Sequence, residues 1–100
     1  MKDKIFTINE ISDILLPILR KYNAQSALLF GSYARNEAHG NSDIDVMVIG
    51  GNSFDPTDIF CVADELYRAS EKNVDVYEET EIDHTSNFYN SIIREGVKIG

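Results

Sequence analysis

The residues best suited to chemistry are two aspartates, Asp43 and Asp45, which follow a Gly31-Ser32 pair along the chain. On a β-strand, the i, i+2 spacing directs both carboxylates to the same face. A third acid, Asp75, lies in a second strand-like run of apolar residues. Clustered carboxylates favour a divalent cation, and a glycine-serine turn at the start of a helix favours a phosphate.

Clustered acids need compensation. Two ionised carboxylates about 4 Å apart repel each other by about 4 kcal/mol at an effective dielectric constant of about 20, a large share of a small domain's stability. A hard cation such as Mg²⁺ offsets that repulsion. Taken alone, an Asp-x-Asp pair is more typical of a solvated strand edge, and Asp75 between two valines could simply face solvent. The linkage of all three acids to the Gly31-Ser32 pair favours the metal site.

Two residues near this turn have alternative interpretations. Ser32 is either the N-cap of a short helix or a phosphate ligand, and one geometry can serve both roles. Arg35 is either a surface ion-pair partner of Glu37 or of another acid, or a guanidinium that contacts nucleotide phosphates. Both interpretations of Arg35 stay open from the sequence.

Seven residues form a linked pattern of a glycine-serine turn, a basic residue, a Ser-Asp-x-Asp motif and a later aspartate on a strand: Gly31, Ser32, Arg35, Ser42, Asp43, Asp45 and Asp75. This pattern resembles the nucleotidyltransferase superfamily that includes DNA polymerase beta. The resemblance implies that the three aspartates are catalytic and hold two Mg²⁺ ions. It also implies that the other four residues of the pattern bind the nucleotide, with ATP as substrate.

One position departs from the family pattern, because Asn36 stands where a glycine usually follows the arginine. Asparagine tolerates the left-handed backbone conformation better than most residues, so the loop can survive the change. Within the superfamily, a chain this short resembles the minimal nucleotidyltransferases, many of which are antitoxins of HEPN-domain toxins. The resemblance therefore implies transfer of AMP from ATP to a hydroxyl of a protein partner, namely a tyrosine of a cognate HEPN RNase toxin. The alternatives are a catalytically silent binding module and nucleotidyl transfer to a small molecule.

Length, composition and charge indicate the number of domains and the kinds of molecule that the protein can bind. One hundred residues, 43% of them hydrophobic, predict one domain over 1–100 with a single core. Neither a signal peptide nor a membrane-spanning run is evident, so we expect a cytoplasmic protein. The net charge of -8 argues against direct binding of long nucleic acids and favours a basic protein partner.

The periodicity of apolar residues predicts alternating helices and strands. A capping box at Thr7 starts a first helix, which Pro17 should kink or split near residues 13–17. Strands are expected at 27–30, 44–49 and 74–77. Further helices are expected around 33–38, after the Asp55-Pro56 pair with Tyr67 in the buried stripe, and over 87–95. This order predicts an α/β fold with a small mixed β-sheet flanked by helices, as in the polymerase beta palm.

Overall fold

The computed structural model describes residues 3–100 and contains one mixed sheet of four strands in the order β3-β2-β1-β4. The strands are β1 (Ser26–Phe30), β2 (Ile44–Ile49), β3 (Val74–Glu78) and β4 (Val97–Ile99). Strand β1 pairs antiparallel with β2 and β4, whereas β2 pairs parallel with β3. The predicted α/β class and mixed sheet are confirmed.

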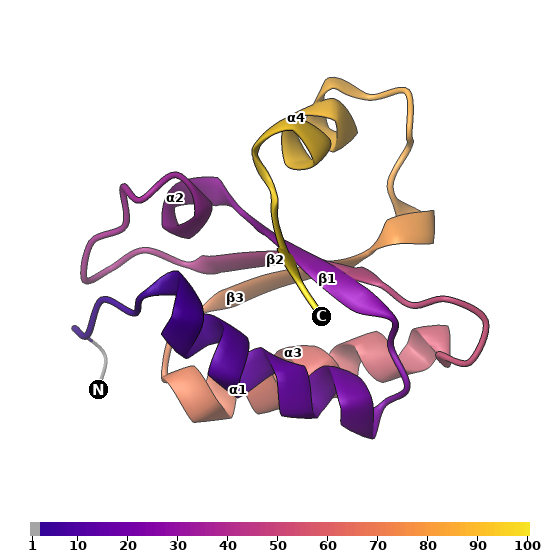
Figure 1. Cartoon of the computed structure of the whole chain (residues 1–100), viewed down its shortest axis with the longest axis horizontal. Coiled ribbons are helices and arrows are strands. Elements are labelled where there is room, and N and C mark those ends of the chain that lie inside the picture. Colours follow the sequence, from indigo (N-terminus) through magenta and orange to yellow (C-terminus); the bar gives the residue numbers. More distant parts are fainter. Residues whose placement is uncertain (1–2) are drawn as a thin grey trace.

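The helices cover both faces of this sheet (Figure 1). Helices α1 (Ile8–Lys21) and α3 (Ile59–Ser70) lie together on one face, and α4 (Asn87–Glu95) lies on the other. The main core is packed between the sheet and helices α1 and α3. A smaller cluster of Phe30, Met47 and Ile92 lies under α4. The sheet therefore offers one thickly covered face and one that is only partly covered.

Short elements connect the main ones. Helix α2 (Gly31–Ala34) follows β1 directly, and the 3₁₀ turns η1 (Pro56–Asp58) and η2 (Glu79–Glu81) precede α3 and follow β3. The Asp55 side chain accepts a hydrogen bond from the Thr57 backbone N–H, as expected for a cap at this helix start. Within residues 3–100, no helix combines the length and the apolar character needed to cross a membrane.

Helix α1 corrects one prediction. The capping box is present, because the Thr7 side chain accepts from the Glu10 N–H and the Glu10 side chain accepts from the Thr7 N–H. Pro17, however, lies inside a single helix rather than splitting it. Both Pro17 and Asp13 are exposed, so water can reach the Asp13 carbonyl that loses its partner. Burial of the opposite helical face, including Leu15 and Leu19, holds the helix together.

Three further predictions need correction. The helix expected around residues 33–38 begins and ends earlier, at Gly31–Ala34, because Asn36 adopts a left-handed conformation with φ 60° that ends the helical path. Tyr67 is half exposed instead of buried. Strand β4 was not expected, since three residues after a helix carry too little periodicity to predict a strand.

Candidate active site

The parallel pairing of β2 and β3 places Asp45 directly opposite Asp75. Asp45 and Met47 alternate along β2 with Ile44, Val46 and Val48, which are fully buried in the main core. The two carboxylates therefore lie on the sheet face that carries α4. Asp43 stands just before β2 at the same end of the strand. The structure thus places Asp45 and Asp75 side by side, with Asp43 two residues before Asp45.

The environment of these carboxylates changes the pKa of Asp45. The pKa of Asp45 is raised from 3.8 to about 6, first by burial, then by the hydrogen bond and like charge of the neighbouring Asp75, and last by the Asp43 charge. The Arg35 charge lowers the same pKa. A carboxylate with this environment binds a proton readily when no other cation is available.

Gly31 allows the turn to approach this pair. Its φ is +74°, and a β-carbon at this position would stand 2.1 Å from Oδ2 of Asp45. Any larger residue would therefore displace the Asp45 side chain and strain the backbone. The helix begins at Gly31 with Phe30 as its N-cap residue, so Ser32 lies in the first turn and is not the cap. The cap interpretation of Ser32 is wrong.

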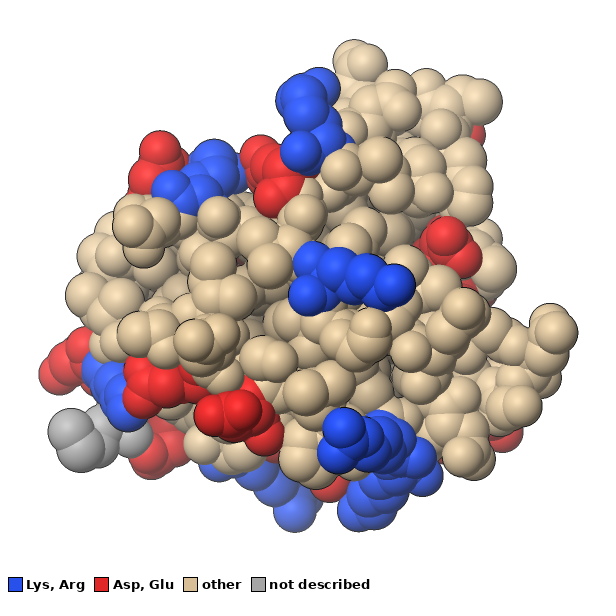
Figure 2. All heavy atoms as spheres, in the orientation of Figure 1, with Lys and Arg blue, Asp and Glu red and all other residues tan. Residues whose placement is uncertain are grey.

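Arg35 lies beside the turn and is held by two acids. Its Nε donates to Glu37 at 2.9 Å, and its Nη1 donates to Oε1 of Glu95 at 3.1 Å. The same Glu95 oxygen accepts the backbone N–H of Gly31 at 3.2 Å. Figure 2 shows acidic and basic side chains next to one another over α2 and toward α4. Of the two interpretations of Arg35, the structure shows the ion pair with Glu37.

The loop between α2 and β2 is braced by Ser42. The Ser42 hydroxyl accepts the His39 N–H at 2.9 Å, and the Ser42 N–H donates to the His39 carbonyl at 3.0 Å. From the other side, Nζ of the buried Lys72 donates to the Gly40 carbonyl at 2.7 Å. These contacts fix the chain just before Asp43. Ser42 therefore has a structural role in placing the first acid.

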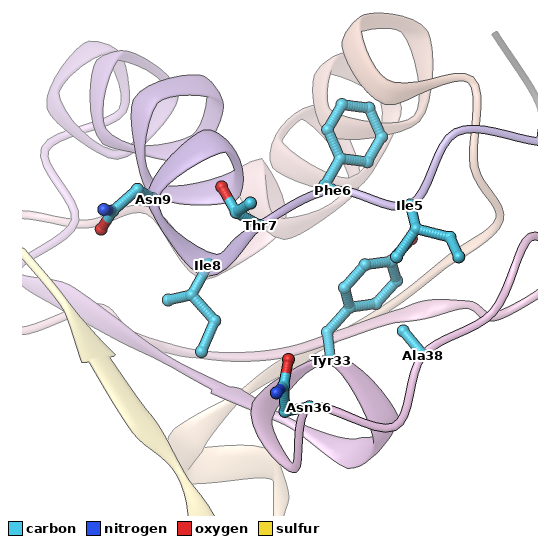
Figure 3. Close-up of a pocket in the computed structure, with 8 residues that line it drawn as sticks. All are labelled: Ile5, Phe6, Thr7, Ile8, Asn9, Tyr33, Asn36 and Ala38. Carbon is cyan, nitrogen blue, oxygen red and sulfur yellow. The ribbon is translucent and has the colours of Figure 1, made fainter.

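Helix α2 is anchored from behind by Tyr33, whose ring lies against the segment that precedes α1 (Figure 3). Tyr33 is only 3% exposed. Together with Ile5, Phe6 and Asn36 it lines a pocket of about 340 Å³, and none of the three aspartates takes part in that lining. The pocket is thus separate from the carboxylates, and packing at Tyr33 supports the turn.

The donor set fits a hard divalent cation, since carboxylate oxygens are the ligands that Mg²⁺ prefers. The pKa of Asp45 is raised first by burial and then by Asp75 and the Asp43 charge, and a cation at this place would offset the like charges. In the part of the chain that the structure describes, no group of three or more His, Cys, Asp or Glu side chains is already arranged to hold a metal. Asp45 instead hydrogen-bonds to Asp75.

An aromatic cluster borders the acids on the open side. Phe30, Tyr77 and Phe88 form three ring pairs with centroids 5.3 to 6.1 Å apart. Tyr77 follows Asp75 by two residues on β3, and burial, then the charges of Asp75 and Asp45, raise its pKa. Tyr77 is 37% and Phe88 43% exposed. An apolar surface therefore begins directly beside the carboxylates.

Fold and site together define a nucleotidyltransferase. The family model described as "Polymerase beta, Nucleotidyltransferase" matches residues 13–100. The chain belongs to this polymerase beta nucleotidyltransferase family.

Relatives by sequence occur in Methanocaldococcus jannaschii. One, named "Putative protein adenylyltransferase", is 44% identical over 69 residues, which are 69% of this chain and 74% of the relative. A second relative with the same kind of name is 50% identical over 46 residues, which are 42% of this chain and 47% of the relative. The chain thus spans most of the first relative and about half of the second.

Solved structures share the fold. A toxin-antitoxin crystal structure with AMP-PNP has a TM-score of 0.75 at 24% identity, over 89% of this chain and 72% of that one. A complex of tri-AMPylated Shewanella oneidensis HEPN toxin with MNT antitoxin has a TM-score of 0.68 at 21% identity, over 90% and 69%. A structure named "putative minimal nucleotidyltransferase" has a TM-score of 0.72 at 23% identity, over 86% of both chains.

Sequence reasoning missed Glu95 and the exposed aromatic surface of Tyr77 and Phe88. Glu95 contacts residues that lie 60 and 64 positions away, so no local pattern signals it. For Phe88, the apolar stripe of α4 indicated a helix but not which of its residues would stay exposed. Only the sheet order, with β3 at an edge, could have pointed to an open surface there.

Proposed function

We propose that this protein transfers AMP from ATP to a hydroxyl of a protein partner and thereby acts as an antitoxin. The observation that carries the proposal is the pairing of Asp45 with Asp75 across β2 and β3, directly against the Gly31 turn. This arrangement combines an acidic pair that attracts a cation with a backbone that a phosphate can approach closely.

Each site residue has a distinct role in this proposal. Asp43 and Asp45 would hold Mg²⁺, and Asp75 would complete a second ion site on the acceptor side. Bound Mg²⁺ supplies neutralising charge at the triphosphate and lowers the pKa of the attacking hydroxyl. The Gly31 N–H, Ser32 and Arg35 would contact phosphate oxygens. Ser42 would act by fixing the loop in front of Asp43.

The transfer balances without a protein nucleophile. The acceptor oxygen bonds to the α-phosphorus, the bond from that phosphorus to the bridging oxygen breaks, and pyrophosphate leaves. The proton of the acceptor hydroxyl departs toward the carboxylates. Among these, Asp75 is the one on the edge strand β3. Positioning and charge therefore do the chemical work.

The names of the relatives and the surface beside the acids support a protein acceptor. Relatives in M. jannaschii are named protein adenylyltransferases, and similar folds occur in toxin-antitoxin structures, one with an AMPylated HEPN toxin. We assign a HEPN toxin as partner and one of its tyrosines as acceptor. The exposed rings of Tyr77 and Phe88 beside Asp75 provide an apolar surface on which a polypeptide segment can lie.

The second candidate is a binding module that neutralises its partner only by covering it. The exposed aromatic surface favours this candidate as well, because docking alone would use it. The exposed rings of Tyr77 and Phe88 and the edge position of β3 favour a protein acceptor over a small molecule.

Separation of the complex distinguishes modification from cover. The toxin is incubated with this protein, ATP and Mg²⁺, separated under denaturing conditions and refolded, and its RNase activity is measured. A covalent phosphodiester survives separation, so we expect the toxin to stay inactive. The control is the same incubation without ATP. If the toxin regains equal activity after both incubations, the protein neutralises its partner only by covering it.

A further inference from the structure

Glu95, the last residue of α4, places one carboxylate oxygen between two donors of the proposed nucleotide site. Its Oε1 accepts the Gly31 backbone N–H at 3.2 Å and the Arg35 Nη1 at 3.1 Å. Its side chain is 26% exposed, compared with 65% for Glu37, the other acid that pairs with Arg35. One partly buried carboxylate thus connects the turn that follows β1 with the end of α4.

We infer that Glu95 is an internal anion that occupies a phosphate position in the nucleotide-free protein and sets the affinity for ATP. The inference rests on the proposed function, because it takes Gly31 and Arg35 as phosphate donors. A carboxylate oxygen and a phosphate oxygen have the same sign of charge and accept the same N–H groups. Both cannot use the Gly31 N–H at once, so the triphosphate must displace Glu95.

The displacement opposes nucleotide binding for two reasons. The carboxylate gives up charge-assisted hydrogen bonds, which are stronger than neutral ones. In addition, a Glu95 that stays nearby repels the incoming phosphates, since it is a like charge in a partly desolvated place. Glu37 differs from Glu95 because its carboxylate pairs with Arg35 alone and does not accept the Gly31 N–H, so a phosphate can reach that N–H without displacing Glu37.

Helix α4 is held in place by contacts that do not involve the Glu95 side chain. The end of α4 is held by the backbone, with the Gly96 N–H donating to the Ile92 carbonyl at 2.7 Å. The chain then continues into β4, which pairs with β1. The buried side chain of Ile92 also holds the helix against the sheet. Neutralising Glu95 therefore leaves α4 in place and replaces the charged acceptor of the Gly31 N–H by a weaker neutral one, and truncation to alanine removes that acceptor altogether.

The test compares ATP binding by four proteins in calorimetry with Mg²⁺: the unmodified protein, Glu95→Gln, Glu95→Ala and Glu37→Gln. Glutamine keeps the shape of residue 95 and removes its charge. Glu37→Gln is the matched control, because it removes an acid from Arg35 without touching Gly31. Melting curves establish that each variant is folded. The Gly31 amide resonance in NMR spectra reports directly whether residue 95 engages the turn.

We expect both Glu95 variants to bind ATP at least about tenfold more tightly than the unmodified protein, as loss of a competing charged hydrogen-bond acceptor should produce. Glu37→Gln should change the dissociation constant less than about twofold. Glu95 variants that bind equally or more weakly, or a control that gains as much as they do, would overturn the inference while leaving the nucleotide site intact. Absence of ATP binding by all four proteins would overturn the proposed function, and this inference with it.

Discussion

The Asp45 carboxylate lies against the α-carbon of Gly31, where a β-carbon would stand 2.1 Å from its Oδ2. Gly31→Ala should therefore push Asp45 out of line with Asp75 and strain a backbone with φ +74°. The left-handed conformation costs a non-glycine residue about 1 to 2 kcal/mol. We expect a melting temperature several degrees lower and a loss of transfer activity of at least about a hundredfold, as a displaced catalytic group can produce.

Gly51 provides a matched control for this substitution. Its φ is +75°, so alanine there meets the same backbone strain, but it lies in the turn after β2, at the opposite end of that strand from Asp45, and its β-carbon would meet the Gln25 side chain instead. Gly51→Ala should lower the melting temperature to a similar extent and retain transfer activity. Equal activity of the two alanine variants would mean that close approach at Gly31 is not required.

The raised pKa of Asp45 predicts how stability changes with pH. Because the folded-state pKa is about 6 and the ordinary value is 3.8, the folded protein binds this proton more tightly than the unfolded chain does. This contribution to stability is complete below about pH 4, is lost as the pH rises through 6, and stays lost above it. Urea unfolding between pH 4 and 8 in EDTA measures the change, and Asp45→Asn should flatten that part of the profile.

Protons and Mg²⁺ compete for the same carboxylate. Below pH 6 the proton held by Asp45 should weaken Mg²⁺ binding, so metal affinity rises between pH 5 and 7 and then levels off. Calorimetry with MgCl₂ across this range tests the expectation. A metal affinity that is independent of pH in this range would place the ion elsewhere.

Removing a carboxylate should separate stability from catalysis. Asp45→Asn and Asp43→Ala relieve repulsion among the acids, so in EDTA at pH 7.5 we expect melting temperatures unchanged or a few degrees higher. Both variants should lose transfer activity, because the cation site loses a ligand. A fall of many degrees in melting temperature for either variant would show that the acids serve the fold.

The aromatic surface should matter for the acceptor and not for ATP. Phe88 is 43% exposed and contacts Tyr77 edge-to-face, with the two ring centroids 5.3 Å apart. Phe88→Ala is expected to weaken partner binding by about tenfold or more, as truncation of an aromatic interface residue often does. ATP affinity should stay the same. Ile93→Ala, on the same helix and 52% exposed, is the matched control for loss of apolar surface.

Local patterns predicted most of the helices and strands, and they predicted that Asp45 and Asp75 can lie on adjacent strands. Alternation along β2 and β3 set the face of Asp45 and Asp75, and parallel register then brought them together. The left-handed Asn36 also agrees with its residue type. Long-range packing decided the rest. Pro17 stays in a helix because the opposite face is buried, and Glu95 reaches Gly31 only because β1 and α4 meet in the folded chain.

Intact mass spectrometry of the partner tests nucleotidyl transfer most directly. The purified toxin is incubated with this protein, ATP and Mg²⁺, and the Asp43→Ala/Asp45→Ala double variant serves as the control. We predict that the toxin gains the mass of one or more adenylyl groups on tyrosine, and that the double variant and EDTA both abolish the gain. A toxin of unchanged mass that is nevertheless inhibited in the complex would contradict the proposal and establish the protein as a binding module.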